Sequence, residues 1–165
     1  MYQIARSSAH AYVMFALVVT ACSPAGDTAM SEDRVGRFAA GYTAAWNSKI
    51  PENVAAYYAA DGWLAINGGE ANVGREALAG VAGSFMSAFP DMVLEFDGLE
   101  FVNGRVKYHW TFTGTNTGPD GTGNAVHFSG FESWVFDDDG LIAESLGNFD
   151  QAEYEHQLAH GVDAE

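Results

Sequence analysis

The spacing of hydrophobic residues changes once along this chain, and the change divides it into a helical part and a strand part. Between residues 31 and 47, apolar side chains recur every three or four positions, which predicts an amphipathic helix. Pro51 suits the first position of a second, shorter helix that includes Tyr58, and residues 61–68 are expected to form a short strand. A third helix is expected over residues 72–90.

After this third helix the hydrophobic period becomes two, which is typical of strands that bury one face. Segments 92–102 and 105–115 flank Asn103-Gly104, a pair of residues that favours a two-residue hairpin turn. A glycine-rich connection then leads to a strand at 125–136, and an acidic turn leads to the last strand at 141–149. A short helix follows this strand.

Helices that precede a meander of strands indicate an α+β fold. We expect a cone-shaped, curved antiparallel sheet with three N-terminal helices packed on one face and a short C-terminal helix. The chain has 165 residues, 48% of them hydrophobic, which is enough for one domain with a core of its own. We place this domain at residues 31–161, followed by a tail at 162–165. The interior of such a cone can stay open as a mostly apolar pocket.

Charge excludes some classes of partner. The formal net charge is −15, and the chain has only seven Lys and Arg residues. A nucleic-acid-binding protein needs a basic surface to neutralise phosphates, so we expect no nucleic-acid partner. Direct binding to anionic membrane surfaces is disfavoured for the same reason.

The residue pattern at the N-terminus indicates an export signal rather than a part of the fold. Residues 1–21 contain one cation, Arg6, followed by an apolar run that is short for a transmembrane helix. The run ends in the sequence VVTAC, which resembles a bacterial lipobox and implies lipidation at Cys22, the only cysteine. Residues 22–30 would then be a flexible tether, and the protein would be exported and lipid-anchored to a membrane of the cell envelope. The alternative is an ordinary signal peptide with Cys22 as an incidental thiol.

Several short motifs in the second half of the chain occur in an order and spacing that resemble one known family. The chain is similar to the SnoaL-like group of the nuclear transport factor 2-like superfamily. The motifs are Gly114-Thr115-Asn116-Thr117-Gly118, Thr122-Gly123, Phe128-Ser129-Gly130, Asp139-Gly140, Asn148-Phe149-Asp150 and Gln157-Leu158.

This resemblance implies a curved sheet, a buried pocket, no metal or organic cofactor, and a homodimer. It also implies a hydrophobic small molecule as the partner. The family includes polyketide cyclases that use a carboxylate and a histidine, and the superfamily also includes isomerases, dehydratases, hydrolases and members that only bind. In this chain the cyclase histidine falls at Trp134 or Ser133, and the cyclase aspartate falls at Gly147. Because none of these residues can form a proton-transferring pair, the family's catalytic residues cannot be carried over.

Glu132 is the strongest candidate for a catalytic residue. It shares a strand face with Phe128, Trp134 and Phe136. Removal from water among such side chains would raise the pKa of its carboxyl group, which suits a general acid or base near neutral pH. The alternative is a carboxylate on an outward face or at a subunit interface, paired with a cation such as Arg105 or Lys107.

The other candidates each have a structural explanation as well. Asp150 is either a second catalytic residue or the N-cap of the last helix. His109 and His127 are expected to point outward, although His109 would be a natural base if the strand faces were reversed. A ligand-binding role is assigned to aromatic residues that could instead be core, and to an asparagine that could orient a ligand: Trp63, Tyr108, Trp110, Trp134 and Asn148.

We therefore expect a cofactor-free acid/base enzyme that acts on a hydrophobic, carbonyl-bearing small molecule as a cyclase, isomerase or dehydratase. The alternative is a membrane-tethered domain that binds a small molecule without catalysis. The acidic turn at residues 137–140 lacks the spacing of a calcium-binding loop, so we expect no metal site there.

Overall fold

The structure, a computed structural model, describes residues 30–162. The predicted signal peptide, Cys22 and nearly all of the tether lie outside these residues, so lipidation and membrane attachment stay predictions, as does the homodimer. No helix among residues 30–162 is long and apolar enough to cross a membrane. The elements, in chain order, are α1 (Glu32–Asn47), α2 (Pro51–Ala55), β1 (Tyr58–Ile66), β2 (Asn72–Val73), α3 (Arg75–Ala88), β3 (Val93–Val102), β4 (Arg105–Thr115), β5 (Ala125–Phe136), β6 (Ile142–Phe149) and α4 (Gln151–His160).

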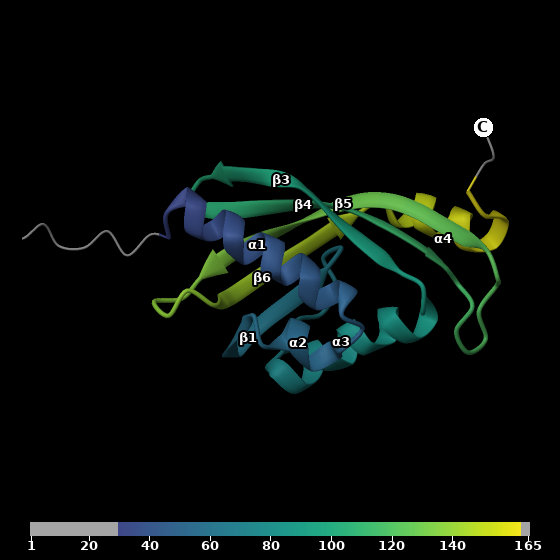
Figure 1. The fold of residues 1–165 in the computed structure, drawn as a ribbon, viewed down its shortest axis with the longest axis horizontal. Coiled ribbons are helices and arrows are strands. Elements are labelled where there is room, and N and C mark those ends of the chain that lie inside the picture. The colour runs from purple at the N-terminus through teal and green to yellow at the C-terminus, as the bar shows by residue number, and fades with distance from the viewer. Residues whose placement is uncertain (1–29, 163–165) are drawn as a thin grey trace, which may run out of the picture.

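The described strands form one six-stranded sheet in the order β2-β1-β6-β5-β4-β3. Figure 1 shows this sheet curving over α1, α2 and α3, with α4 at the far end of the long strands. The α+β fold with a curved sheet is therefore confirmed. Pairing is antiparallel throughout except between β1 and β6, which run parallel. Register shifts in the β3–β4 and β5–β6 pairs mark bulges, which bend strands and help to curve a sheet.

The predicted hairpin between β3 and β4 is confirmed. Asn103 and Gly104 both have positive φ, at 51° and 76°, as a two-residue turn that matches the twist of the strands requires. The early strand is longer than expected, because α2 ends at Ala55 and Tyr58 already belongs to β1. The prediction that put Tyr58 in a helix was wrong. The helix has only five residues before the strand begins, and so short a segment does not distinguish a helical period from a strand period.

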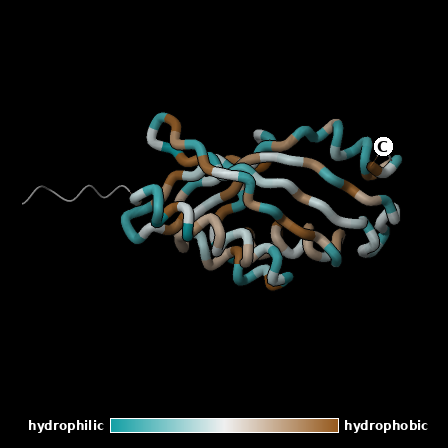
Figure 2. Tube along the Cα trace, turned by 45° about the horizontal axis from the view of Figure 1, so that its top comes forward, coloured by the Kyte–Doolittle hydropathy of each residue, from teal (hydrophilic) through white to brown (hydrophobic). Residues whose placement is uncertain are grey.

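Burial alternates along β4 and β5 as the two-residue period predicts. On β5, Val126, Phe128, Glu132 and Trp134 are buried, whereas His127 and Ser129 are exposed. The hydropathy colours change repeatedly along the strands in Figure 2, as this alternation requires. The core therefore lies between the inner face of the sheet and the three N-terminal helices.

The glycine-rich loop after β4 closes onto the end of α3. The Gly118 amide donates to the Ala88 carbonyl at 3.1 Å, and the Asn116 side chain donates to the same carbonyl at 3.2 Å. A Cβ atom at position 118 would overlap the backbone carbonyl oxygen of Ser87. Glycine is needed at this position because the loop backbone lies directly against the helix backbone.

Gly118→Ala is expected to lower the free energy of unfolding by about 1–3 kcal/mol, because the loop or the helix end must move to admit the methyl group. Gly80→Ala is the matched control, since a Cβ there has no neighbouring atom within 4 Å. At this exposed helical position, the change to alanine should raise the free energy of unfolding by about 0.5–1 kcal/mol. Urea unfolding of both variants would measure the difference, and an unchanged Gly118→Ala variant would contradict the proposed contact.

Candidate functional site

A pocket opens between the inner face of the sheet and helices α1 and α3. Its wall is formed by aliphatic and aromatic side chains from both helices and from the sheet, and it encloses about 60 Å³. That space has room for a few water molecules, and it is smaller than the roughly 150 Å³ that admits a benzene ring. A ring-sized ligand therefore requires the lining side chains to move apart. Among the described residues that line this pocket, Glu132 carries the only ionisable side chain.

The Glu132 carboxylate lies on the inner face of β5, and the residue is only 7% exposed. Four side chains donate hydrogen bonds to its Oε2 atom: Ser145 Oγ at 2.7 Å, Trp134 Nε1 at 3.0 Å, and the Tyr42 and Tyr58 hydroxyls at 3.2 Å each. Its Oε1 atom accepts only from the Tyr42 hydroxyl, at 3.2 Å, a donor that it shares with Oε2. Oε1 therefore retains most of its capacity to accept a further proton.

Burial controls the electrostatics of this group. It raises the pKa of the Glu132 carboxyl above its ordinary value, although the hydrogen bonds from Trp134, Ser145 and the two tyrosines act in the opposite direction. The pKa values of Tyr42 and Tyr58 are raised well above normal, first by burial and then by the nearby Glu132 charge. Both tyrosines consequently stay protonated and serve as donors, while the Glu132 carboxyl changes its protonation state at a higher pH than an ordinary glutamate.

Two glycines shape the wall around Glu132. Gly147 is the cross-strand partner of Glu132 on β6 and lines the pocket without a side chain of its own. Gly130 pairs with Trp110 on β4, and a Cβ at position 130 would overlap the Trp110 indole. The glycine of the Phe-Ser-Gly motif thus lets Trp110 lie across β5 as part of the pocket wall.

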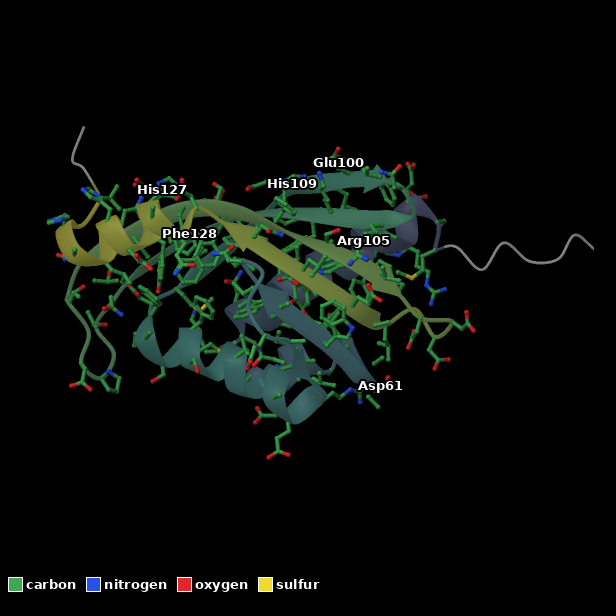
Figure 3. All side chains as sticks on the ribbon, turned by 180° about the vertical axis from the view of Figure 1, so that it is seen from behind. Asp61, Glu100, Arg105, His109, His127 and Phe128 are labelled. Carbon is green, nitrogen blue, oxygen red and sulfur yellow. The ribbon has the colours of Figure 1, made fainter. Side chains whose placement is uncertain are left out.

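Both histidines that the sequence singled out on β4 and β5 lie outside the pocket, as expected. His109 is on the outer face of the sheet, with Nε2 3.6 Å from Glu100 Oε2, and its side chain is 40% exposed. His127 is exposed as well. Figure 3 shows both residues and Glu100 along the strands, on the side turned away from α3. Neither histidine can therefore act as a base inside the pocket.

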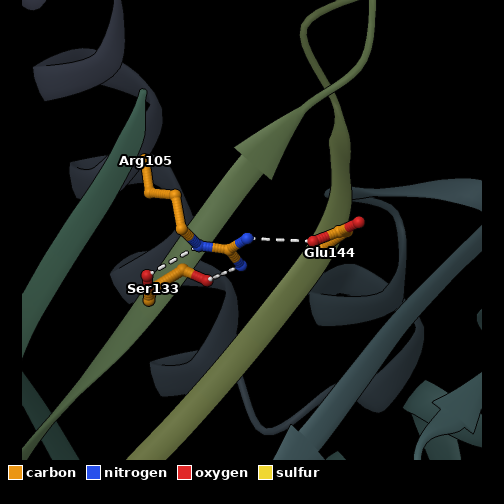
Figure 4. Close-up of polar contacts among 3 residues, drawn as sticks. All are labelled: Arg105, Ser133 and Glu144. Carbon is orange, nitrogen blue, oxygen red and sulfur yellow. Dashed lines mark hydrogen bonds and ion pairs between the residues drawn. The ribbon is translucent and has the colours of Figure 1, made fainter. Parts of the chain in front are cut away.

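The cations that were considered as partners for Glu132 bind other groups on the outer face. Arg105 donates to Glu144 Oε2, Ser133 Oγ and the Ser133 carbonyl, each at 2.9 Å (Figure 4). Lys107 lies 3.2 Å from Glu100 Oε2. The alternative of an outward, cation-paired Glu132 is therefore wrong.

The structure separates the residues that were predicted to bind a ligand. Trp110 lines the pocket. Trp134 is fully buried and donates to Glu132, and Tyr108 stacks on it at 4.7 Å, but neither is part of the pocket wall. Trp63 and Asn148 do not line it either, because their strand neighbours Leu64, Gly147 and Phe149 occupy the inner face.

Asp150 serves as the N-cap of α4, with its carboxylate accepting from the Glu153 amide at 3.0 Å. This position supports the structural alternative for Asp150 and places it away from the pocket wall. Among residues 30–162, no group of three or more His, Cys, Asp or Glu side chains is arranged to hold a metal ion.

Sequence reasoning did not identify three partners of Glu132. Tyr42, on α1, and Tyr58, on β1, are 90 and 74 residues away in sequence. Ser145 on β6 could have been placed on the inner face, since it shares the parity of Gly147 and Phe149. The approach of the two tyrosines depends on helix packing, for which the sequence offered no local pattern.

The raised pKa of Glu132 predicts a specific pH dependence of stability. Because the folded-state pKa lies above the unfolded value of about 4.3, the contribution of Glu132 to stability is present below that value and is lost as pH rises through the folded pKa. Relative to Glu132→Gln, the wild-type free energy of unfolding should fall by up to about 1.4 kcal/mol per pH unit over that range. The measurement is urea unfolding between pH 4 and pH 8.

Glu144→Gln is the matched control, because this carboxylate lies on the outer face and its side chain is 41% exposed. This variant retains Glu132, so its free energy of unfolding should fall with rising pH as that of the wild type does. If the wild type and Glu132→Gln keep a constant difference over the whole range, the carboxyl group is not held in the environment described above.

Comparisons with known proteins agree with this architecture. The SnoaL-like polyketide cyclase family matches residues 37–158. Among solved structures, TsrD from Streptomyces laurentii superposes with a TM-score of 0.67 at 19% identity, covering 79% of this chain and 98% of TsrD. A SnoaL-like polyketide cyclase from Jannaschia sp. CCS1 superposes with a TM-score of 0.62 at 12% identity, covering 76% and 94% of the two chains.

A third similar structure is SalBIII, an epoxide hydrolase/cyclase-like enzyme with a role in pyran ring formation in the polyether salinomycin. Its TM-score is 0.64 at 15% identity, covering 74% of this chain and 95% of SalBIII. No curated protein sequence matches the chain significantly. The structural similarities show a shared fold, and the family match covers most of the domain. This chain belongs to the SnoaL-like polyketide cyclase family.

Proposed function

We propose that this protein is an acid/base enzyme that acts on a small, hydrophobic molecule with a carbonyl group and uses Glu132 to transfer a proton. The observation that carries the proposal is the single ionisable side chain in the wall of an apolar pocket. Burial raises the pKa of this group above that of an ordinary glutamate, which suits a residue that both accepts and returns a proton. The family resemblance implies that such a reaction needs no cofactor.

The chemistry begins at a carbon next to the carbonyl group. A C–H bond breaks, the proton moves to the Glu132 carboxylate, and the electron pair moves into an enolate. Return of the proton to a different carbon gives isomerisation. Attack of the enolate carbon on a second carbonyl forms a C–C bond and closes a ring. The π bond of that carbonyl breaks, and its oxygen takes the proton back from Glu132 as a hydroxyl group. Loss of a hydroxyl group from the adjacent carbon gives dehydration, with the proton from Glu132 leaving in the water.

The position of Glu132 relative to Gly147 also supports this role. The family's cyclase carboxylate falls at Gly147 in this chain, and Gly147 is the direct cross-strand partner of Glu132. The two positions are adjacent on the inner face of the sheet. This chain thus has a glycine at the position on β6 where the resemblance places the cyclase carboxylate, and the paired position on β5 supplies a carboxylate to the same pocket. Ring formation, named for SalBIII, is one of the reactions that this arrangement could perform.

A second candidate function is binding without catalysis, in a domain attached to a membrane through Cys22. It is favoured by the four hydrogen bonds that hold Glu132, since these donors also stabilise a purely structural carboxylate. In that case the pocket would hold an apolar ligand and release it unchanged.

Exchange of deuterium into small ketones distinguishes the two functions. A panel of ketones of increasing size, from butanone to acetophenone, is incubated with the protein in D₂O, and loss of the protons next to the carbonyl is followed by NMR. The wild type is expected to accelerate exchange over buffer, and Glu132→Gln should lower the rate at least about 100-fold. Glu144→Gln, on the outer face, should retain the wild-type rate.

Exchange that persists in Glu132→Gln would show that another group removes the proton. Saturable binding of these ketones without accelerated exchange would favour the binding domain over the enzyme.

A further inference from the structure

The Trp46 indole N–H has no hydrogen-bond partner, although it is buried. Within residues 30–162, Trp46 Nε1 is the only fully buried side-chain nitrogen or oxygen atom without one. The residue is 8% exposed, and its ring lines the pocket. Buried N–H groups are nearly always paired, and leaving one unpaired costs about 1–3 kcal/mol. An unpaired donor at the wall of a pocket is therefore available to an acceptor on a ligand.

The neighbours of Trp46 offer its N–H no acceptor at normal hydrogen-bonding geometry. Trp46 lies one helical turn after Tyr42 on α1, with ring centroids 6.3 Å apart and planes at 87°. On its other side the ring contacts Phe85 of α3, 6.2 Å away, which has no polar atom. The Tyr42 hydroxyl donates to Glu132, and its oxygen lies near the Trp46 N–H, but the two make no hydrogen bond of normal geometry.

The Trp46 N–H nevertheless lies beside the Glu132 group. Burial is the main cause of the raised pKa of Tyr42, followed by the charge of Glu132, and the Trp46 N–H acts in the opposite direction by favouring the ionised phenol. The donor and the carboxyl group are thus neighbours through Tyr42, and both residues line the same pocket. Because the N–H itself is fully buried, a ligand reaches it when the lining side chains move apart. Trp110, the other indole in the wall, is only partly buried, and its N–H is not among the fully buried unpaired atoms.

We propose that Trp46 Nε1–H binds the carbonyl oxygen of the substrate while Glu132 removes a proton from the neighbouring carbon. This inference rests on the proposed function and narrows the substrate class to compact hydrocarbon skeletons with a carbonyl group next to a C–H bond. As the C–H bond breaks, its proton goes to Glu132 and its electron pair shifts toward the carbonyl oxygen. The hydrogen bond from Trp46 strengthens as negative charge develops on that oxygen.

This arrangement also makes Trp46 a determinant of specificity. A molecule of the same shape without the oxygen leaves the donor unpaired, so it loses the hydrogen bond that the carbonyl compound makes. Apart from the donor itself, Glu132 and Trp110, the side chains that line the pocket are apolar and do not distinguish two molecules of the same shape.

The test compares acetophenone with α-methylstyrene, which has a C=CH₂ group in place of C=O and is otherwise the same shape. Dissociation constants for both are measured by ligand-observed NMR. In the wild type and in Glu132→Gln, the hydrogen bond from Trp46 should make the dissociation constant of α-methylstyrene larger than that of acetophenone. In Trp46→Phe the ratio of the α-methylstyrene constant to the acetophenone constant is expected to fall about tenfold, because one hydrogen bond to acetophenone is lost. Trp63→Phe, the same change outside the pocket, should leave the ratio unchanged.

An unchanged ratio in Trp46→Phe would overturn the role of Trp46, for example because a fixed water already satisfies the indole. It would leave the role of Glu132 untouched, which the deuterium-exchange experiment decides separately. If Trp46→Phe does not fold, benzothienylalanine at position 46 keeps the shape of the indole and replaces the N–H with sulfur. The same tenfold fall is then expected, and an unchanged ratio again contradicts the proposal.

Discussion

The hydrogen-bonded burial of one carboxyl group is the constraint on which the rest of this structure depends. Glu132 is removed from water on the inner face of β5, and the groups that satisfy it come from α1, β1, β5 and β6. An unpaired carboxylate in such a place would cost several kcal/mol, so these four elements must approach in one arrangement. The same group therefore ties α1 to the sheet, and in the proposed function it is the proton carrier of the pocket.

The outer face of the sheet differs from the inner face because its charged side chains are exposed to water. Its ion pairs, Arg105 with Glu144 and Lys107 with Glu100, lie in contact with solvent, where such pairs contribute little to stability. Charge is tolerated on this face because water can reach it. On the inner face, by contrast, glycines at 130 and 147 keep space for Trp110 and for the approach to Glu132. The proposed proton transfer is thus placed on the inner face, where Glu132 lines the pocket.

Local patterns were sufficient to predict much of this arrangement. The two-residue period placed Glu132 on the same face as Trp134, and Asn103-Gly104 marked the hairpin, since each depends on residues close in sequence. Long-range features could not be predicted in this way. The parallel pairing of β1 with β6 joins strands about 80 residues apart, and the unpaired Trp46 N–H becomes evident only once its neighbours are in place. Trp63 lies outside the pocket wall. The sequence could not predict this, because the alternation of side chains along an isolated strand does not say which of its faces is the inner one.

The most direct measurement is a titration of the Glu132 carboxyl carbon by ¹³C NMR, with the signal assigned by its absence from Glu132→Gln. A carboxyl group that is buried in the cone and available for proton transfer should titrate with a midpoint above the value of about 4.3 that is usual for glutamate. A midpoint at or below that value would mean that the four donors outweigh burial and hold a permanently ionised, structural carboxylate. That result would contradict the account of Glu132 as the proton carrier.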